Sequence, residues 1–225
     1  MKQNILLIFI YLIISNTVNA QEKLIYVGDP MCSWCYGFAP ELEKLIEKHK
    51  SQMDIELITG GLRPYFKKPI NEMKDFLSHH WEDVNKASQQ PFNYDILDQS
   101  DIIYDTEPAC RAVVVVRHMD REKEFEFFKL IQEAFYYKNK NLTIAENYFP
   151  ILDNLGLEKE TFRKHFYSDE YKELVKEDFK RASALGVQGF PSLLLEYEGK
   201  LTILTRGYTS AEIVNDAINS VLKEN

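Results

Sequence analysis

The stretch "GDPMCSWCYGFAP", Gly28 to Pro40, holds two cysteines separated by Ser33 and Trp34. A short apolar run, "KLIYV", comes before it, and an amphipathic run, "PELEKLIEKHK", overlaps its end. This order predicts a buried strand, a turn, and a helix whose first residues carry the cysteine pair. Cys32 would then lie at the helix N-terminus and Cys35 one helical turn further on.

Strand and helix patterns continue beyond this stretch. A second apolar run, residues 54–64, is stopped by Gly60-Gly61 and predicts a strand parallel to the first, joined by a right-handed crossover. Two apolar runs around Glu198-Gly199 predict a hairpin over residues 192–208, followed by a terminal helix. Between these strands lie helical patterns at residues 69–87, 106–118, 121–137, 143–155, 158–166 and 168–185.

These patterns predict the fold class α/β, with a mixed central sheet and an inserted all-helical domain. Thr143 begins a capping-box pattern for the fourth of the helices, and Ser168 is a candidate N-cap for the last. The expected division is a first part of the sheet domain at 21–62, the helical insertion at 63–185, and a second part of the sheet domain at 186–225.

Residues 1–20 have the pattern of a signal peptide. Lys2 precedes an apolar block, Ile5 to Ile14, and the segment ends in small or modest residues up to Ala20. Spanning a bilayer takes about 20 apolar residues, so this block is short for the alternative, an uncleaved anchor. We therefore predict cleavage after Ala20 and an exported protein, periplasmic if the source is a Gram-negative bacterium.

The net charge of the chain makes some classes of binding partner unfavourable. The formal net charge is −8, and cleavage would remove a lysine and no acid. An acidic protein with no basic block is a poor candidate for binding nucleic acid. No second apolar stretch approaches the length of a membrane span, so we expect no stable membrane insertion after cleavage.

The chain has three cysteines, too few for a small secreted disulfide scaffold. In an exported chain of this size, a single Cys-x-x-Cys pair indicates redox chemistry. A zinc site would require further ligands, and the sequence has neither a second such pair nor turn-spaced histidines, so we predict no metal and no cofactor. An inert structural disulfide is the other alternative.

The expected roles of the two sulfurs follow from their positions. Unpaired N–H groups and the dipole at a helix N-terminus favour a thiolate, the form that attacks disulfides. Cys32 is therefore the predicted nucleophile and Cys35 the resolving thiol. A carboxylate at Asp29 close to Cys32 would oppose the thiolate form.

Three further positions complete the set of candidates. In "GVQGFP", residues 186–191, Pro191 stands at the mouth of a predicted strand, where it cannot donate a ladder hydrogen bond. Cys110 lies on the most apolar helix and is expected to be a core thiol, with a regulatory or intermolecular thiol as the alternative. Trp34, between the cysteines, either packs in the core or contacts substrate.

The motifs in order, "DPMCSWCYGF", "GGLRP", "EPACRAV", "AFYYKNKNLT" and "GVQGFPSLLL", resemble the DsbA-like branch of the thioredoxin superfamily, and within it the FrnE-like disulfide isomerases. Pro40, eight residues after Cys32, is similar to the helix-kinking proline of thioredoxin-like proteins. The resemblance covers nearly all of the chain after residue 20. It implies a thioredoxin fold, a cis Pro191 facing the cysteine pair, and a Phe190 backbone that pairs with bound substrate.

The predicted function is an exported thiol–disulfide oxidoreductase acting on cysteine-containing proteins and recharged by an unidentified redox partner. Ser33, Trp34 and Phe190 are the expected substrate contacts. Since no positive charge lies between the cysteines, we expect a potential between about −270 mV, that of thioredoxin, and about −120 mV, that of DsbA. A Cu(I) or zinc chaperone and a glutathione-dependent isomerase or transferase stay open as alternatives.

Overall fold

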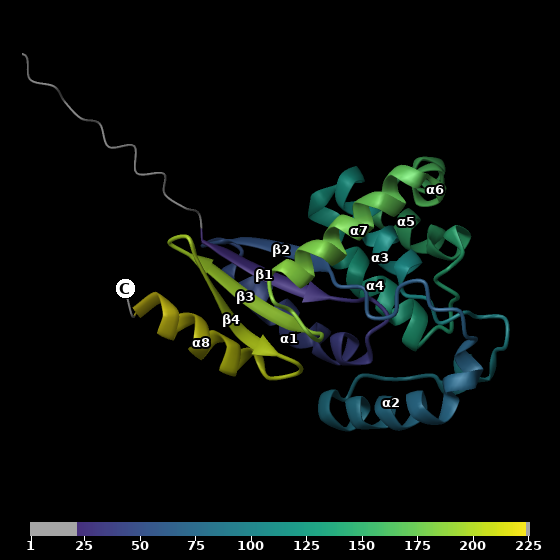
Figure 1. Cartoon of the computed structure of the whole chain (residues 1–225), viewed down its shortest axis with the longest axis horizontal. Helices are drawn as coiled ribbons and strands as arrows, with labels where there is room; N and C mark the ends of the chain where they lie inside the picture. Colours follow the sequence, from purple (N-terminus) through teal and green to yellow (C-terminus); the bar gives the residue numbers. More distant parts are fainter. Residues whose placement is uncertain (1–21, 224–225) are drawn as a thin grey trace, which may run out of the picture.

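The computed structural model describes residues 22–223, and the predicted signal peptide lies outside these residues. The molecule has a sheet at one end and a group of helices at the other (Figure 1). Within residues 22–223, no helix is both long and apolar enough to cross a membrane.

The sheet has four strands in the order β2-β1-β3-β4. The first two strands pair in parallel, and the other two pairings are antiparallel, so the predicted mixed sheet is confirmed. β1 is central and apolar on both faces, as expected for a strand covered on both sides. The strands are β1 (Lys23–Gly28), β2 (Asp54–Thr59), β3 (Ser192–Tyr197) and β4 (Lys200–Arg206).

Helices cover both faces of this sheet. Leu24 and Tyr26 of β1 pack with residues of α1 (Ser33–His49) and α8 (Ala211–Lys223). The alternate residues of the strand face the other side, where they pack against α7 (Asp169–Ala184). The two-residue period of a strand therefore divides β1 between two apolar clusters.

The remaining helices lie between β2 and β3 in the chain and form the helical part of Figure 1. One continuous apolar core joins them to the sheet, with α3, which is buried from Glu107 to Val116, at its centre. The helices are α2 (Lys74–Ser88), α3 (Glu107–Met119), α4 (Glu124–Tyr136), α5 (Phe149–Leu155) and α6 (Lys159–Tyr167), with single turns η1 (Ile70–Met73), η2 (Tyr94–Asp98), η3 (Arg121–Lys123) and η4 (Ala145–Tyr148).

The two predicted N-caps differ in outcome. Ser168 is confirmed, since its hydroxyl accepts a hydrogen bond from the Tyr171 N–H at 3.4 Å. The capping box at Thr143 is wrong, and α5 begins only at Phe149. Both the N–H and the hydroxyl of Thr143 donate to Asn141 Oδ1, at 3.0 and 2.7 Å, so this polar segment forms a turn instead of starting a helix.

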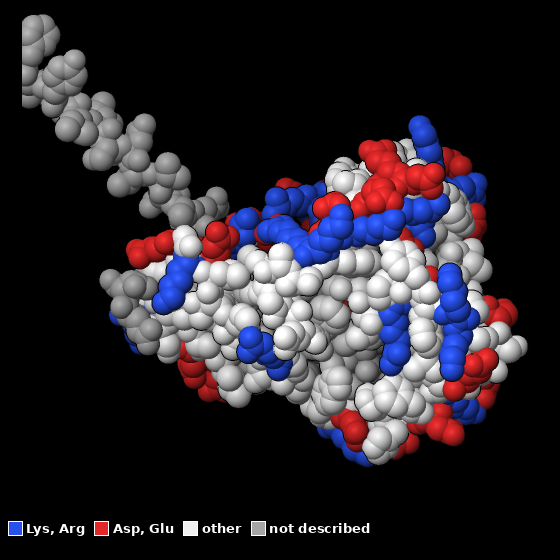
Figure 2. All heavy atoms as spheres, viewed as in Figure 1, with Lys and Arg blue, Asp and Glu red and all other residues white. Residues whose placement is uncertain are grey.

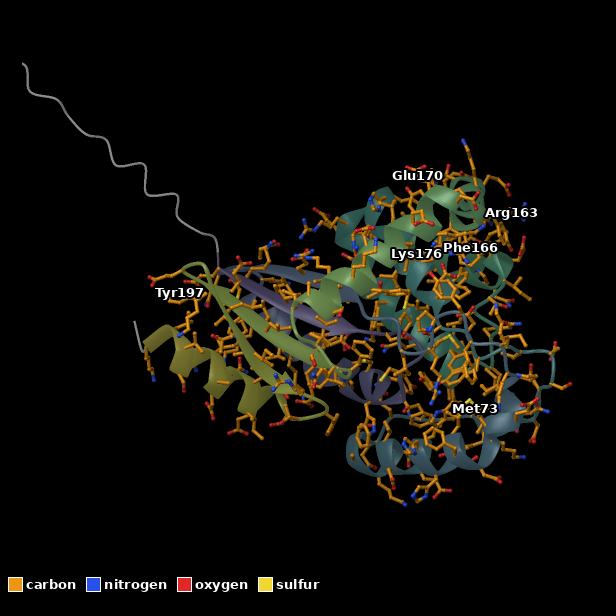
Figure 3. The ribbon with its side chains drawn as sticks, in the orientation of Figure 1. Met73, Arg163, Phe166, Glu170, Lys176 and Tyr197 are labelled. Carbon is orange, nitrogen blue, oxygen red and sulfur yellow. The ribbon has the colours of Figure 1, made fainter. Side chains whose placement is uncertain are left out.

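The "EPACRAV" motif places a buried ion pair in the helical part. Arg111 Nε lies 2.9 Å from Glu107 one turn earlier on α3. The same guanidinium donates to the Phe166 carbonyl and lies 4.5 Å from the centre of that ring. Phe166, labelled in Figure 3, belongs to α6, so the pair ties α3 to α6 inside the helical part.

Candidate redox site

The cysteine pair lies at the junction of β1 and α1, as the sequence predicts. Cys32 is the N-cap of α1; its N–H donates to the Asp29 carbonyl and its own carbonyl accepts from the Tyr36 N–H, both at 3.0 Å. Cys32 is 5% exposed, whereas Cys35, inside the helix, is fully buried. Both are free thiols in this structure. Of the two residues, only Cys32 therefore reaches the surface.

The segment before β3 meets the first sulfur. The Phe190–Pro191 peptide bond is cis, and Cys32 Sγ lies 3.7 Å from the Phe190 carbonyl oxygen. The Gly207 N–H donates to the Pro191 carbonyl at 2.7 Å and holds this segment from the other side. Cys32 and Phe190 are 158 positions apart in the chain. The fold thus brings together the two motifs that the sequence analysis selected.

One detail of the predicted site is wrong for the thiol state. The helix N-terminus was expected to direct its free N–H groups at Cys32 Sγ, but this sulfur makes no capping hydrogen bond. The thiol is itself a donor, and the Phe190 carbonyl is the acceptor within reach. The geometry of the reduced site is therefore decided by the cis-proline segment as well as by the helix.

A shallow pocket of about 310 Å³ opens beside the first cysteine, lined by Trp34, Ala87, Phe190, Gly207 and Tyr208. The centres of the Trp34 and Tyr208 rings are 5.7 Å apart, and the Tyr208 hydroxyl donates to the Ala87 carbonyl at 3.1 Å. Both Trp34 and Phe190 are half-buried, as Ser33 also is. Figure 2 shows few charged residues over β3 and β4, the strands next to this pocket.

Gly60 positions the cis-proline segment, a role that the sequence analysis missed. A Cβ atom at this glycine would lie 2.0 Å from the Phe190 ring, so the ring packs directly on the Gly60 backbone. The glycine pair was interpreted only as the end of a strand. Its packing against the Phe190 ring could not be predicted, because a single sequence does not show which distant residue packs on a glycine.

A buried carboxylate lies behind the cysteine loop. Asp29 accepts from the Met31 N–H at 2.8 Å, from the Leu62 N–H at 2.6 Å and from the Cys110 thiol at 3.4 Å. Burial raises the pKa of Asp29, and these donors act in the opposite direction. Asp29 therefore fastens three segments together, and Cys110 is the buried core thiol that its helix predicted.

The second sulfur is surrounded by protein. Burial raises the pKa of the Cys35 thiol well above its usual range, and the neighbouring Cys32 acts in the same direction. The Asp29 N–H and the Tyr26 hydroxyl lower the pKa. In the described part of the chain, no group of three or more histidine, cysteine and acidic residues is placed to hold a metal ion. Cys32 thus lies at the edge of the protein and Cys35 is enclosed, one helix turn apart.

Comparisons with known proteins agree with the fold described above. A family model described as thioredoxin matches residues 25–215. A solved structure of a candidate protein disulfide isomerase from Nitrosomonas europaea is 33% identical, with a TM-score of 0.83, and the match covers 91% of this chain and 99% of that one.

Two further matches are less similar in sequence. The cytosolic disulfide reductase DsbM from Pseudomonas aeruginosa is 23% identical, with a TM-score of 0.75 and coverage of 90% and 100%. The ClpXP adapter protein SpxH of Bacillus subtilis is 22% identical over 166 residues, 73% of this chain. The chain spans only 55% of the length of SpxH. The match over residues 25–215, together with the mixed sheet and its helical insertion, shows that the chain belongs to the thioredoxin family.

Proposed function

We propose that this protein exchanges disulfides with cysteine-containing proteins through Cys32 and Cys35. The observation that carries the proposal is the position of Cys32 Sγ, at the N-terminus of α1 and 3.7 Å from the carbonyl that precedes the cis proline. A sulfur in this place lies next to its resolving partner and adjoins a backbone to which a substrate segment can pair.

The chemistry needs only the two sulfurs. When the Cys32 thiolate attacks a substrate disulfide, a Cys32–substrate disulfide forms and one substrate sulfur leaves as thiolate. Attack by the Cys35 thiolate on Cys32 Sγ then forms the internal disulfide and releases the second substrate sulfur. The reverse sequence oxidises a substrate dithiol and reduces the protein. The redox partner that recharges the pair decides which direction dominates.

The surroundings of Cys32 favour a peptide in extended form as the substrate. Its backbone would pair beside Phe190, in the manner of an added strand, with its cysteine facing Cys32. A neighbouring apolar side chain would then enter the pocket between Trp34 and Tyr208. Ser33, half-buried between the cysteines, is placed to hydrogen bond with such a segment.

Export is part of the proposal and depends on the N-terminal segment, residues 1–20. DsbM, one of the structures with the same fold, is described as cytosolic, so the fold alone does not assign a compartment. N-terminal sequencing of protein secreted or released from an export-competent host tests this point. A mature N-terminus at Gln21 is expected, and exported protein that still begins at Met1 would contradict the cleavage.

Refolding of ribonuclease tests the activity. Scrambled ribonuclease measures isomerisation and reduced ribonuclease measures oxidation, so activity on one substrate alone assigns the direction. We expect Cys32→Ala to abolish both activities and Cys35→Ala to accumulate a mixed disulfide with the substrate. Cys110→Ala is the matched control, since its thiol is fully buried. Tight stoichiometric copper or zinc binding without either activity would refute the proposal and support the metal-chaperone alternative.

A further inference from the structure

Tyr26 carries a polar group in an apolar place. It lies on β1, is fully buried, and its ring stacks on Phe38 at 6.2 Å between ring centres and meets Phe128 edge-on at 5.9 Å. Among residues 22–223, its hydroxyl has no hydrogen-bond partner. Buried polar groups are nearly always paired, so an unpaired hydroxyl in a well-packed core calls for an explanation.

Cys35 is the group on α1 with which the Tyr26 hydroxyl interacts electrostatically. Cys35 precedes Phe38 by one turn of α1, so both face the Tyr26 side chain from the same helix. The interaction between the Tyr26 hydroxyl and Cys35 favours the thiolate, as does the Asp29 N–H. Two neighbouring donors thus favour the thiolate of the enclosed sulfur, one from the backbone and one from a side chain.

Gly28 leaves room for the hydroxyl in this position. Tyr26 and Gly28 are two apart on β1 and face the same side of the sheet. A Cβ atom at Gly28 would lie 2.6 Å from the Tyr26 oxygen, closer than non-bonded atoms approach. The backbone of β1 and the core around the ring thus hold the hydroxyl beside Cys35. Burial also raises the pKa of the Tyr26 phenol well above its usual range, so the group stays a donor.

The unpaired state belongs to the thiol form, in which all three cysteines are free. A thiol sulfur is a weak acceptor, whereas a thiolate accepts a charge-assisted hydrogen bond. During disulfide exchange, Cys35 must pass through the thiolate form in a site without solvent. The donor that has no partner in the resting thiol would have one at that moment.

We propose that the Tyr26 hydroxyl donates a hydrogen bond to the Cys35 thiolate while Cys35 attacks or leaves Cys32. This inference rests on the proposed exchange at the cysteine pair. In the resolving step, the Cys35 sulfur bonds to Cys32 Sγ, the bond between Cys32 and the substrate breaks, and its electron pair leaves with the substrate sulfur. The proton of Cys35 leaves the site with that sulfur, so the net product is the internal disulfide and a substrate thiol. Tyr26 keeps its proton throughout.

The loss of this donor has a defined kinetic signature. A hydrogen bond to a charged group is worth about tenfold in the population of the thiolate. A less acidic thiolate is also more nucleophilic, by about threefold for each tenfold change in acidity, so the net rate falls about threefold. Opening of the internal disulfide slows by the same factor, because it passes through the same transition state. The thiol–disulfide equilibrium of the cysteine pair at neutral pH stays unchanged. The hydrogen bond stabilises only the thiolate, and the reduced protein holds Cys35 as a thiol.

The experiment is stopped-flow reaction of the reduced protein with 5,5′-dithiobis(2-nitrobenzoate). The first equivalent of nitrothiobenzoate reports attack by Cys32, and the second reports attack by Cys35 on the mixed disulfide. Tyr26→Phe is expected to slow the second phase about threefold across the pH range in which Cys35 is a thiol. The first phase and the equilibrium constant with glutathione should change by less than twofold. Tyr148→Phe, which removes a buried hydroxyl bonded to the Leu142 carbonyl, should change neither phase.

An unchanged second phase in Tyr26→Phe, or an equilibrium constant displaced as much as the rate, would overturn the inference. If Tyr26→Phe does not fold, 3-fluorotyrosine in place of Tyr26 supplies a stronger donor of nearly equal size. It should accelerate the second phase, and no acceleration would again refute the role. The proposed function fails separately, if the wild-type protein releases nitrothiobenzoate without a second phase that depends on Cys35.

Discussion

Helix α3 is fastened to the sheet at both ends through buried carboxylates, but the partners of those carboxylates differ. At its N-terminal end, Asp29 is held by neutral donors: two backbone N–H groups and the Cys110 thiol. At its C-terminal end, Arg117 donates to Asp178 at 2.9 Å, to Glu124 at 2.5 Å and to the Leu57 carbonyl at 2.9 Å.

The difference indicates that the contacts at the Arg117 end of α3 stabilise the fold, whereas those at the Asp29 end position the redox site. Arg117 joins α3 to α4 and α7 through ion pairs and to β2 through the Leu57 carbonyl, where no reaction has to be accommodated. Beside the sulfurs, neutral donors hold the carboxylate and the backbone in position. A guanidinium at the same distance would stabilise a thiolate strongly and make the site a more powerful oxidant. The intermediate potential expected from the sequence stays a prediction, which a glutathione titration measures.

The largest expected effect concerns the charged end. Arg117→Ala leaves two carboxylates buried without their cation and should lower the free energy of unfolding by about 3–5 kcal/mol. Urea unfolding monitored by circular dichroism measures this change. Arg121→Ala removes an exposed arginine that lies 3.4 Å from Asp54, and should cost less than about 1 kcal/mol. Equal effects of the two variants would remove the distinction between a buried network and a surface pair.

The pH dependence of stability should arise from the same end of α3. Burial raises the pKa of Glu124 from 4.5 to about 7, against the effect of Arg117 and together with that of Asp178. A carboxyl whose pKa is raised on folding stabilises the protein fully below pH 4.5, and this contribution is lost as the pH rises through about 7.

Glu124→Gln removes this titration. The stability of the wild-type protein relative to the variant should therefore fall by about 3 kcal/mol between pH 4.5 and pH 7. Urea unfolding at several pH values measures the two curves. Glu160→Gln, at an exposed glutamate, should give a curve parallel to that of the wild type. Parallel curves for Glu124→Gln would show that this carboxyl has the same pKa in the folded and unfolded chain.

The neutral end should be sensitive to shape. Gly60→Ala places a methyl group 2.0 Å from the Phe190 ring, so it should destabilise the protein by about 1–3 kcal/mol and slow the reaction of Cys32 by moving the Phe190 carbonyl. Gly189→Ala is the matched control, because a Cβ atom there meets nothing within 4 Å. Urea unfolding and the first nitrothiobenzoate phase, which reports attack by Cys32, measure the two effects. If both are as in the wild type, the Phe190 ring can move without loss of stability or reactivity.

The smallest expected effect is at the buried third cysteine. Cys110→Ala removes a donor to Asp29, whereas Cys110→Ser keeps one, so the alanine variant should be about 1 kcal/mol less stable than the serine variant at neutral pH. Urea unfolding of the pair measures this difference. A serine variant that is the less stable of the two would show that Cys110 acts as an apolar filler and not as a partner of Asp29.

Local patterns in the chain were enough for the framework. The apolar runs indicated four strands and their mixed order, the Cys-x-x-Cys pair was placed at a helix N-terminus, and Cys110 was placed in the core. These predictions succeed because periodicity, turn residues and helix ends depend on neighbours in the chain. The Thr143 capping box failed for the same reason, since a nearby asparagine competed for the same groups.

By itself, then, the sequence determined the elements, the cysteine pair and the family resemblance that implied a cis Pro191. Only the tertiary structure decided what surrounds the sulfurs: the Phe190 carbonyl at Cys32, the Phe190 ring on Gly60, the Tyr26 hydroxyl at Cys35 and the donors on Asp29. These contacts join segments far apart in the chain. Their partners are selected by packing of whole side chains in three dimensions, which no local pattern encodes.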